Sequence, residues 1–218
     1  MAEKELKKCI IVCASPNADA EFVKQIITPD DYVIAADGGM ALLEKAGIIP
    51  NLFVGDFDSY RGSIPDGVEI IKLKTHKDDT DSMHCAEVAV ERGFDEICLL
   101  GATGGSLSHT FSNFCVLSFL ENKGVNAVMS DKHGDVRVLG EGVYSFNNLS
   151  GHEFSVFPFG CENAVVSYIG NVEYHANDLI LAYNSSLGKS NVFRSDDVKI
   201  AVKQGNAIVF ISNKENYQ

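Results

Sequence analysis

Basic residues are scarce in this sequence. Lysine and arginine together number 18 against 30 aspartates and glutamates, which gives a formal net charge of -12. Proteins that bind nucleic acid present a basic face to the phosphate backbone, so the charge balance argues against DNA and RNA as partners. An acidic chain is compatible with an enzyme that holds polyanions through a bound divalent metal, because the metal inverts the local electrostatics.

Paired cysteines and long apolar runs are also missing. No CxxC pair and no cysteine–histidine spacing suggests zinc, and no stretch approaches the ~18 apolar residues of a membrane span. The apolar run Cys9–Ala14 is too short for the core of a signal peptide. We therefore expect a soluble cytoplasmic protein that does not bind membranes. Its 6 cysteines lie mostly inside apolar runs and are expected to be buried free thiols in a reducing compartment: Cys9, Cys13, Cys85, Cys98, Cys115 and Cys161.

The first part of the chain has the pattern of an α/β fold. With about 150 residues per domain as a guide, 218 residues make one large or two small domains. Up to about residue 130, short apolar runs alternate with segments of helical period, which predicts a mostly parallel sheet flanked by helices. The predicted strands are Cys9–Cys13, Tyr32–Ala36, Leu52–Gly55, Glu69–Leu73, Glu96–Leu100 and Ala127–Ser130, and the predicted helices are Asp19–Ile27, Met40–Ala46, Thr80–Arg92 and Leu107–Asn122.

After about Gly134 the pattern changes to short β-like runs between Gly, Asn and Ser, with no convincing helix. We predict a first domain of residues 1–133 and a second, all-β domain of residues 134–218, a small sandwich. The last two strands, joined by Lys203–Asn206, are expected to form a hairpin. The predicted strands are Val136–Leu139, Glu153–Phe157, Ala164–Ile169, Asp178–Ala182, Val198–Val202 and Ala207–Ser212.

Acidic motifs follow successive predicted strands. They read Asp37-Gly38-Gly39, Gly55-Asp56-Phe57-Asp58-Ser59 and Lys77-Asp78-Asp79-Thr80-Asp81. Because the carboxyl ends of parallel strands share one edge of the sheet, these loops can converge in one crevice. Two of these motifs also have a plainer interpretation: the first as a turn before a helix, and Asp79 or Thr80 of the third as a helix N-cap.

Converging carboxylates predict a bound cation. Two of them at ~4 Å repel by about 4 kcal/mol at an effective dielectric near 20, and a cation removes that cost. Asp56 and Asp58 are alternate residues of an extended segment, so both carboxylates point to one side. Oxygen ligands without histidine or cysteine favour Mg²⁺, which usually combines carboxylates with substrate phosphates.

A glycine-rich segment, Gly101-Ala102-Thr103-Gly104-Gly105, lies between a predicted strand and a predicted helix. Glycines allow the backbone to approach a phosphate, and the N-terminus of the helix supplies unpaired N–H donors. His109 and Asn113 are four residues apart on that helix and share a face. Either residue can also be an ordinary polar side chain, and for His109 alone that is the default interpretation.

Taken in series, these motifs resemble the thiamine pyrophosphokinase family. The resemblance covers nearly the whole chain, since Ser190-Asn191 and the segment Val198–Ser212 are similar to the family's β-domain. It implies an α/β nucleotide-binding domain followed by a β-sandwich. It further implies a homodimer whose active sites form where the two chains meet, and an enzyme that transfers the diphosphate of ATP to the hydroxyl of thiamine.

The resemblance also implies roles for single residues. Mg²⁺ would be held by Asp56, Asp58 and Asp81, with Asp78 assisting in catalysis. ATP would be bound by residues of the first and fourth motifs and the helix that follows: Asp37, Gly38, Gly39, Gly104, Gly105, His109 and Asn113. Thiamine would be bound by Ser190 and Asn191. A carboxylate not engaged with the metal could accept the hydroxyl proton.

Two departures from the family pattern stand out. The family usually continues its double glycine as Arg-x-Asp-His, whereas this chain has Ser106 and Ser108 at the charged positions. The arginine is a phosphate contact and the aspartate a carboxylate near the substrates, so both charges are lost here. The chain also has no tryptophan, which in many family members stacks on thiamine, so Tyr183 or another aromatic residue would have to replace it.

Three other functions are compatible with parts of the pattern. The run Leu52–Asp58 superficially matches the strand and DxD motif of aspartyl-phosphate phosphatases, although those enzymes normally have Thr or Val where this chain has Tyr60. A nucleotide- or thiamine-binding module could have lost catalysis with the changes at Ser106 and Ser108. A diphosphokinase could also act on another heteroaromatic alcohol, such as a hydroxymethylpterin.

Overall fold

The computed structural model describes residues 7–74 and 79–213. By its internal contacts the chain divides into two compact units, Met1–Lys132 and His133–Gln218. Among the described residues, every helix is too short or too polar to cross a membrane. The chain has the expected mixed α/β composition, with parallel strands and helices in the first unit and antiparallel strands in the second.

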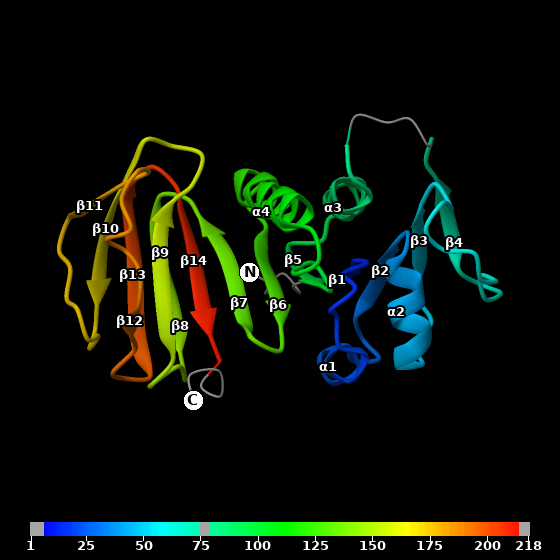
Figure 1. Ribbon diagram of the computed structural model, residues 1–218, viewed down its shortest axis with the longest axis horizontal. Helices are drawn as coiled ribbons and strands as arrows, with labels where there is room; N and C mark the ends of the chain where they lie inside the picture. Colours follow the sequence, from blue (N-terminus) through cyan, green and yellow to red (C-terminus); the bar gives the residue numbers. More distant parts are fainter. Residues whose placement is uncertain (1–6, 75–78, 214–218) are drawn as a thin grey trace, which may run out of the picture. The chain divides into compact units, whose positions relative to one another are not determined.

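The first unit is built on parallel strands in the order β6-β5-β1-β2-β3-β4 (Figure 1). Their bounds are β1 Lys8–Val12, β2 Tyr32–Ala36, β3 Leu52–Gly55, β4 Glu69–Lys72, β5 Glu96–Leu100 and β6 Asn126–Asp131. From β1 the chain proceeds outward to β2, β3 and β4, and then returns to the other side of β1 for β5 and β6. The strand order therefore reverses between β1 and β5, and such a switch point is where open parallel sheets bind ligands.

Helices cover both faces of these strands. Their bounds are α1 Ala20–Ile26, α2 Gly39–Ala46, α3 Asp81–Glu91 and α4 Leu107–Asn122. One core cluster joins side chains of α1 and α2 to Ile10 and Val12 of β1, whereas Cys9 and Ile11 alternate to the opposite face and are also fully buried. Helix α3 packs on β1, β2 and β3 without entering that cluster, so it covers the other face with its neighbour α4 (Figure 1).

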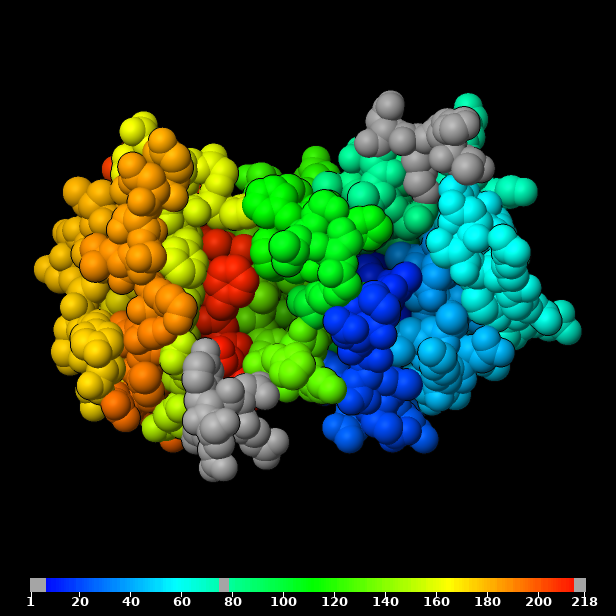
Figure 2. Space-filling model, viewed as in Figure 1, coloured from blue at the N-terminus to red at the C-terminus, as the bar shows by residue number. Residues whose placement is uncertain are grey.

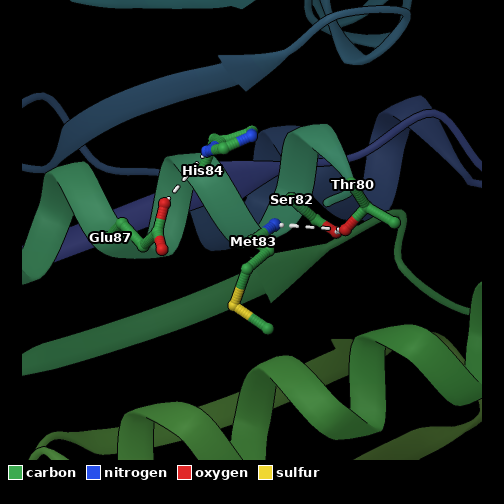
Figure 3. Close-up of polar contacts among 5 residues, drawn as sticks. All are labelled: Thr80, Ser82, Met83, His84 and Glu87. Atoms are coloured by element: carbon green, nitrogen blue, oxygen red, sulfur yellow. Dashed lines mark hydrogen bonds and ion pairs between the residues drawn. The ribbon is translucent and has the colours of Figure 1, made fainter. Parts of the chain in front are cut away.

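Local sequence explains where the helices begin. Asp19 caps α1, since its carboxylate accepts hydrogen bonds from the backbone N–H groups of Glu21 and Phe22 at 3.0 and 3.3 Å. Thr80 caps α3, and its hydroxyl oxygen accepts from the N–H of Met83 at 3.3 Å (Figure 3). Of the two N-cap candidates, Thr80 is therefore the one used.

The second unit consists of two antiparallel groups of strands that share a core. One group has the order β12-β9-β14-β7 and the other β11-β10-β13-β8. Inward side chains of both groups, including Phe154, Val166 and Val209, form one buried cluster. The bounds are β7 Gly134–Leu139, β8 Gly142–Asn147, β9 Glu153–Pro158, β10 Asn163–Ile169, β11 Leu179–Ala182, β12 Asn191–Val192, β13 Asp197–Gln204 and β14 Ala207–Ser212.

The predicted hairpin between the last two strands is wrong. Strand β13 pairs with β8 and β10, and β14 pairs with β7 and β9, so the two strands belong to different groups. The chain crosses from one group to the other at Gly205, whose φ of 74° a side chain rarely adopts. The short connection suggested a hairpin, but both strands alternate toward the shared core, which places them across it from each other.

Two strands of the second unit escaped prediction. Strand β8 alternates half-exposed and exposed residues along most of its length, so its apolar signal is weak. Strand β12 has only 2 residues, which is too few for an alternating pattern to be recognised.

Gly39 offers a test of the packing between α2 and β1. A Cβ built at this residue would lie 2.0 Å from the backbone oxygen of Val12, an atom that cannot rotate away. We expect Gly39→Ala to lower the free energy of unfolding by about 3 kcal/mol, the upper end of the usual cost of overpacking. Urea denaturation followed by circular dichroism measures this change.

The matched control is Gly47→Ala. Gly47 ends the same helix with a φ of 71° and open space around a built Cβ, so only the left-handed conformation is penalised, by about 1 kcal/mol. Equal effects of the two substitutions would contradict the close approach of α2 to Val12.

Candidate active site

A pocket of about 250 Å³ opens at the switch point of the first unit. Its walls come from the segments that follow β1, β2 and β5 and from the first turns of α3 and α4. This is the edge at which the sequence predicted a site. The predicted site residues that line it are Asp37, Gly38, Asp81, Gly104, His109 and Asn113.

Asp37 is the buried acid of this pocket. It follows β2 with a φ of 37°, unusual for a residue with a side chain, and is 3% exposed. Its Oδ2 accepts a hydrogen bond from the N–H of Ser59 at 3.2 Å, whereas its buried Oδ1 has no hydrogen-bond partner among the described residues. Burial raises the pKa of Asp37 and the charges of Asp81 and Asp58 raise it further, while the hydrogen bonds of Ser59 oppose this shift.

Asp56 and Asp58 come close to Asp37. One carboxylate oxygen from each of the three residues lies within 4.8 Å of the others. The loop that presents them is held by its own hydrogen bonds: the N–H of Asp58 donates to Asp56 Oδ1 at 3.1 Å, and the Ser59 hydroxyl donates to Asp58 Oδ1 at 2.7 Å. Phe57 between them has a φ of 69°, so this turn is strained as well.

Asp81, the third residue predicted to bind metal, lies apart from this group of three. It is the first residue of α3 and lines the pocket. Its charge, together with burial as the larger cause, raises the pKa of the Cys13 thiol to about 12. Thus the structure brings Asp37, predicted as a nucleotide contact, to Asp56 and Asp58, while Asp81 faces the same pocket. Asp78 lies outside the described residues.

The charge of the pocket bears on what it can bind. Two aspartates line it, and neither lysine nor arginine is among the described residues that do so. A phosphate chain would therefore meet negative charge unless a cation entered with it. An ion with Mg²⁺–oxygen distances of about 2.1 Å has opposite ligands about 4.2 Å apart, which the group Asp37, Asp56 and Asp58 can supply. Together with the unpartnered Oδ1 of Asp37, these carboxylates fit a divalent cation that prefers oxygen.

The glycine-rich segment also lines the pocket. Gly104 has a φ of 86°, and a Cβ there would lie 3.0 Å from Asn17 Nδ2, so the backbone turns in a space that excludes larger residues. The Thr103 hydroxyl donates to Asp131 at the end of β6, and the N–H of Gly104 donates to Thr110 Oγ1 at 3.2 Å. Ser106 caps α4 without a side-chain hydrogen bond to its first turn, which leaves N–H donors facing outward.

Gly39 and Gly105, also predicted as ATP contacts, do not line the pocket. Gly39 is buried against the backbone of Val12, and a Cβ at Gly105 would lie 2.8 Å from Pro16 Cδ. Close packing thus accounts for both glycines. Ser106 and Ser108 are exposed, and their hydroxyl oxygens are 2.7 Å apart.

His109 and Asn113 both line the pocket but differ in their exposure to solvent. His109 is exposed. Asn113 is 7% exposed, and its amide is engaged at both ends: Oδ1 accepts from the Ser82 hydroxyl and Nδ2 donates to the oxygen of Ala102, each at 2.8 Å.

The predicted thiamine contacts lie in the second unit. Ser190 has a φ of 62°, and its hydroxyl donates to Glu153 Oε1 at 3.0 Å and accepts from Lys189 Nζ at 2.9 Å. Asn191 is buried, and its amide makes two hydrogen bonds to the backbone of Tyr174, at 2.8 and 2.9 Å. Asn191 is therefore a structural clamp in this unit. Tyr183 is 69% exposed, so its ring is accessible.

Several pocket residues were not predicted. Cys13 and Ser15 follow the central strand β1, and their position next to the switch point could have identified them as pocket residues. Ser59 was noted only as the end of an acidic motif, although it hydrogen-bonds both Asp37 and Asp58. Ser82 carries no sequence signal that separates it from an ordinary residue in the first turn of a helix.

Known proteins match this chain over much of its length. Residues 23–129 match the family model described as thiamin pyrophosphokinase, catalytic domain. A thiamine pyrophosphokinase of Bacillus subtilis (strain 168) is 27% identical over 164 residues, which cover 72% of this chain and 76% of the relative.

Solved structures share the fold. A crystal structure of thiamine pyrophosphokinase from Bacillus subtilis superposes with a TM-score of 0.85 at 23% identity, over 95% of this chain and 99% of the other. That of thiamin pyrophosphokinase from Geobacillus thermodenitrificans gives a TM-score of 0.84 at 23% identity, over 97% and 100%. The family model matched by residues 23–129 and the curated relative both indicate the thiamin pyrophosphokinase family.

Proposed function

We propose that this protein transfers the diphosphate group of ATP to the hydroxyl of thiamine, giving thiamine diphosphate and AMP. The observation that carries the proposal is the pocket of the family's catalytic domain, where an acidic group with an unpartnered buried oxygen faces a glycine-rich helix N-terminus. The first feature suits a metal ion and the second suits the phosphates that accompany it.

The proposed reaction is an in-line displacement. The hydroxyl oxygen of thiamine attacks the β-phosphorus of ATP, and the bond from that phosphorus to the oxygen shared with the α-phosphorus breaks. AMP leaves with the shared oxygen, and one proton is released from the hydroxyl. Because an alcohol is a weak nucleophile, the site must orient the two reactants and offset the charge on the phosphates.

The described residues suit these tasks. We propose that Mg²⁺ is held by Asp56 and Asp58, with Asp37 beside them, and by Asp81 from the start of α3; when bound, the ion would neutralise phosphate charge. The first turn of α4 would hold the phosphates through its backbone N–H groups, with Gly104 beside them at the pocket. A carboxylate not engaged with the metal would take the hydroxyl proton.

We propose the remaining assignments by the same likeness. Residues 1–133 would form the nucleotide-binding domain, and residues 134–218 a β-sandwich domain in which Ser190 and Asn191 help to form the thiamine pocket. Asn191 would do so by holding the backbone of Tyr174. The protein would act in the cytoplasm as a homodimer. Exposed apolar side chains support an assembly: on α4, whose outer surface is visible in Figure 2, Leu107 is 88% and Phe111 59% exposed.

The first test is an assay of the purified protein with Mg-ATP and thiamine, with products separated by chromatography. We expect AMP and thiamine diphosphate in equal amounts. Asp56→Asn combined with Asp58→Asn is expected to abolish turnover and leave the circular dichroism spectrum unchanged, since both carboxylates belong to the acidic group with Asp37 and neither residue is part of the core. Thiamine binding without AMP would indicate a binding module, and phosphate release from simple esters would indicate a phosphatase.

Asp37→Asn tests the electrostatics of the site. Because the pKa of Asp37 is raised, the folded chain holds its proton more tightly than the unfolded chain, so the ionised carboxylate destabilises the metal-free protein at pH 7. This penalty disappears as the pH falls through the raised pKa toward the unfolded value of about 3.9. We expect Asp37→Asn to raise the melting temperature at pH 7 in EDTA, to lose that gain near pH 4, and to remove stabilisation by Mg²⁺.

The control for this experiment is Asp66→Asn, which removes one charge from an exposed residue. Melting curves from pH 4 to pH 8, with EDTA or Mg²⁺, compare the two variants. If both respond alike to pH and Mg²⁺, Asp37 has no special part in the acidic group.

Ser190→Gly tests the proposed thiamine contact. Glycine accepts the φ of 62° without strain, so the substitution removes the hydroxyl while keeping the backbone. We expect KM for thiamine to rise about tenfold, the equivalent of one lost hydrogen bond, with KM for ATP unchanged. Asn148→Gly, which relieves a similar φ of 60° in the same unit, is the control. An unchanged KM for thiamine would exclude a contact through the Ser190 hydroxyl.

A further inference from the structure

Asn113 joins segments that are far apart in the sequence. Its side chain extends from α4 and receives a hydrogen bond from Ser82 on α3, 31 residues earlier. Its other end donates to the carbonyl of Ala102, in the glycine-rich segment 11 residues earlier. Both distances are 2.8 Å, and Asn113 and Ser82 are each 7% exposed. The amide orientation is therefore fixed, since the oxygen must face the hydroxyl and the NH₂ group must face the carbonyl.

The same logic sets the direction of the neighbouring hydrogen bonds. The Ser82 hydroxyl has one proton, which it donates to Asn113, so in its 3.0 Å contact with Thr80 it must accept. Thr80 then donates to Ser82 while accepting from the N–H of Met83 as the N-cap. Figure 3 shows the hydroxyls of Thr80 and Ser82 side by side at the start of α3. One directed chain thus runs from Thr80 through Ser82 and Asn113 to Ala102.

This chain of hydrogen bonds begins on either side of Asp81 in the sequence. Thr80 precedes Asp81, Ser82 follows it, and all three residues line the pocket. At its other end the chain reaches Ala102, which also lines the pocket and stands two residues before Gly104. The hydrogen bonds therefore set the separation between a carboxylate and the segment suited to phosphate.

We infer that Asn113 is a positioning residue, which holds the glycine-rich segment at a fixed distance from Asp81, in place of the predicted contact with ATP. The inference rests on the proposed function, because this distance matters only if substrate phosphates bind in the pocket between Asp81 and the glycine-rich segment. Removing either Ser82 or Asn113 breaks the same connection. Losing one link should therefore cost nearly as much as losing both.

The test compares Ser82→Ala, Asn113→Ala and the double variant with the unmutated protein. We expect each single substitution to lower kcat/KM about 10- to 100-fold, as loss of an outer supporting partner commonly does. The loss should fall more on kcat than on KM for ATP. The kcat/KM of the double variant should lie within about twofold of that of the less active single variant. Ser82→Thr, which keeps the hydroxyl, should retain most of the activity.

Two controls separate positioning from general stability. Asn122→Ala makes the same chemical change at an exposed residue of the same helix, and it should leave activity unchanged. All assays are run well below the lowest melting temperature of the set. Binding of α,β-methylene-ATP with Mg²⁺, which cannot be cleaved at the reacting bond, is measured by calorimetry as a readout that does not depend on turnover.

The outcomes distinguish the inference from the proposed function. If Asn113→Ala raises KM for ATP and weakens analogue binding while Ser82→Ala does neither, Asn113 contacts ATP directly and the inference is overturned. Multiplying effects in the double variant would overturn it as well. If the unmutated protein neither turns over ATP with thiamine nor binds the analogue, the proposed function fails, and the inference with it.

Discussion

Carboxylates that share one end of a parallel sheet repel each other, and the first unit is organised around that repulsion. Strand order brings Asp37, Asp56 and Asp58 to within 4.8 Å of one another, with Asp81 on the same pocket. The fold stabilises this arrangement locally: backbone N–H groups and the Ser59 hydroxyl donate to the carboxylates, and Gly55 leaves room for Asp37, whose Cβ and Oδ1 would lie 2.8 Å from any added Cβ. Among the described residues, no donor reaches Oδ1 of Asp37, and this is the atom that a cation would contact.

In the first unit, some pocket segments are held by strained backbone conformations and others by hydrogen bonds. Asp37 and Phe57 both adopt positive φ, and such conformations persist only where the surroundings hold them. The strands beneath them are buried on both faces, so the loops begin from fixed points. Between the start of α3 and the glycine-rich segment, a directed chain of hydrogen bonds from Thr80 to Ala102 holds the residues in place. The acidic loops are thus held by backbone conformation, and the start of α3 and the glycine-rich segment are held by polar contacts.

Sequence reasoning succeeded where the signal is local and failed where it depends on distant partners. Helix α4 was predicted with its observed bounds because both of its ends have a local signal. A glycine-rich turn precedes its first residue, and Gly124 follows shortly after its last. The hairpin failed because the length of a connection does not reveal which strands lie on either side. The closeness of Asp37 to the DxD residues follows from the β2–β3 pairing, which no single motif contains. Asn113 was singled out for its face on the helix, but its partners 11 and 31 residues away could not be read from that face.

The crossing at Gly205 has a consequence for how the protein forms during synthesis. Strand β14 lies between β7 and β9, so neither of these strands has its inner neighbour until residues 207–212 have left the ribosome. The pairing of β7 with β14 joins residues about seventy positions apart, and such non-local contacts are slow to close. The described strands of the first unit, β1 to β6, form their parallel pairs with one another and need no partner from residues 207–212 for those pairs. Translation therefore favours a sequence in which the pocket-bearing unit matures first and the second unit completes its core in one late step.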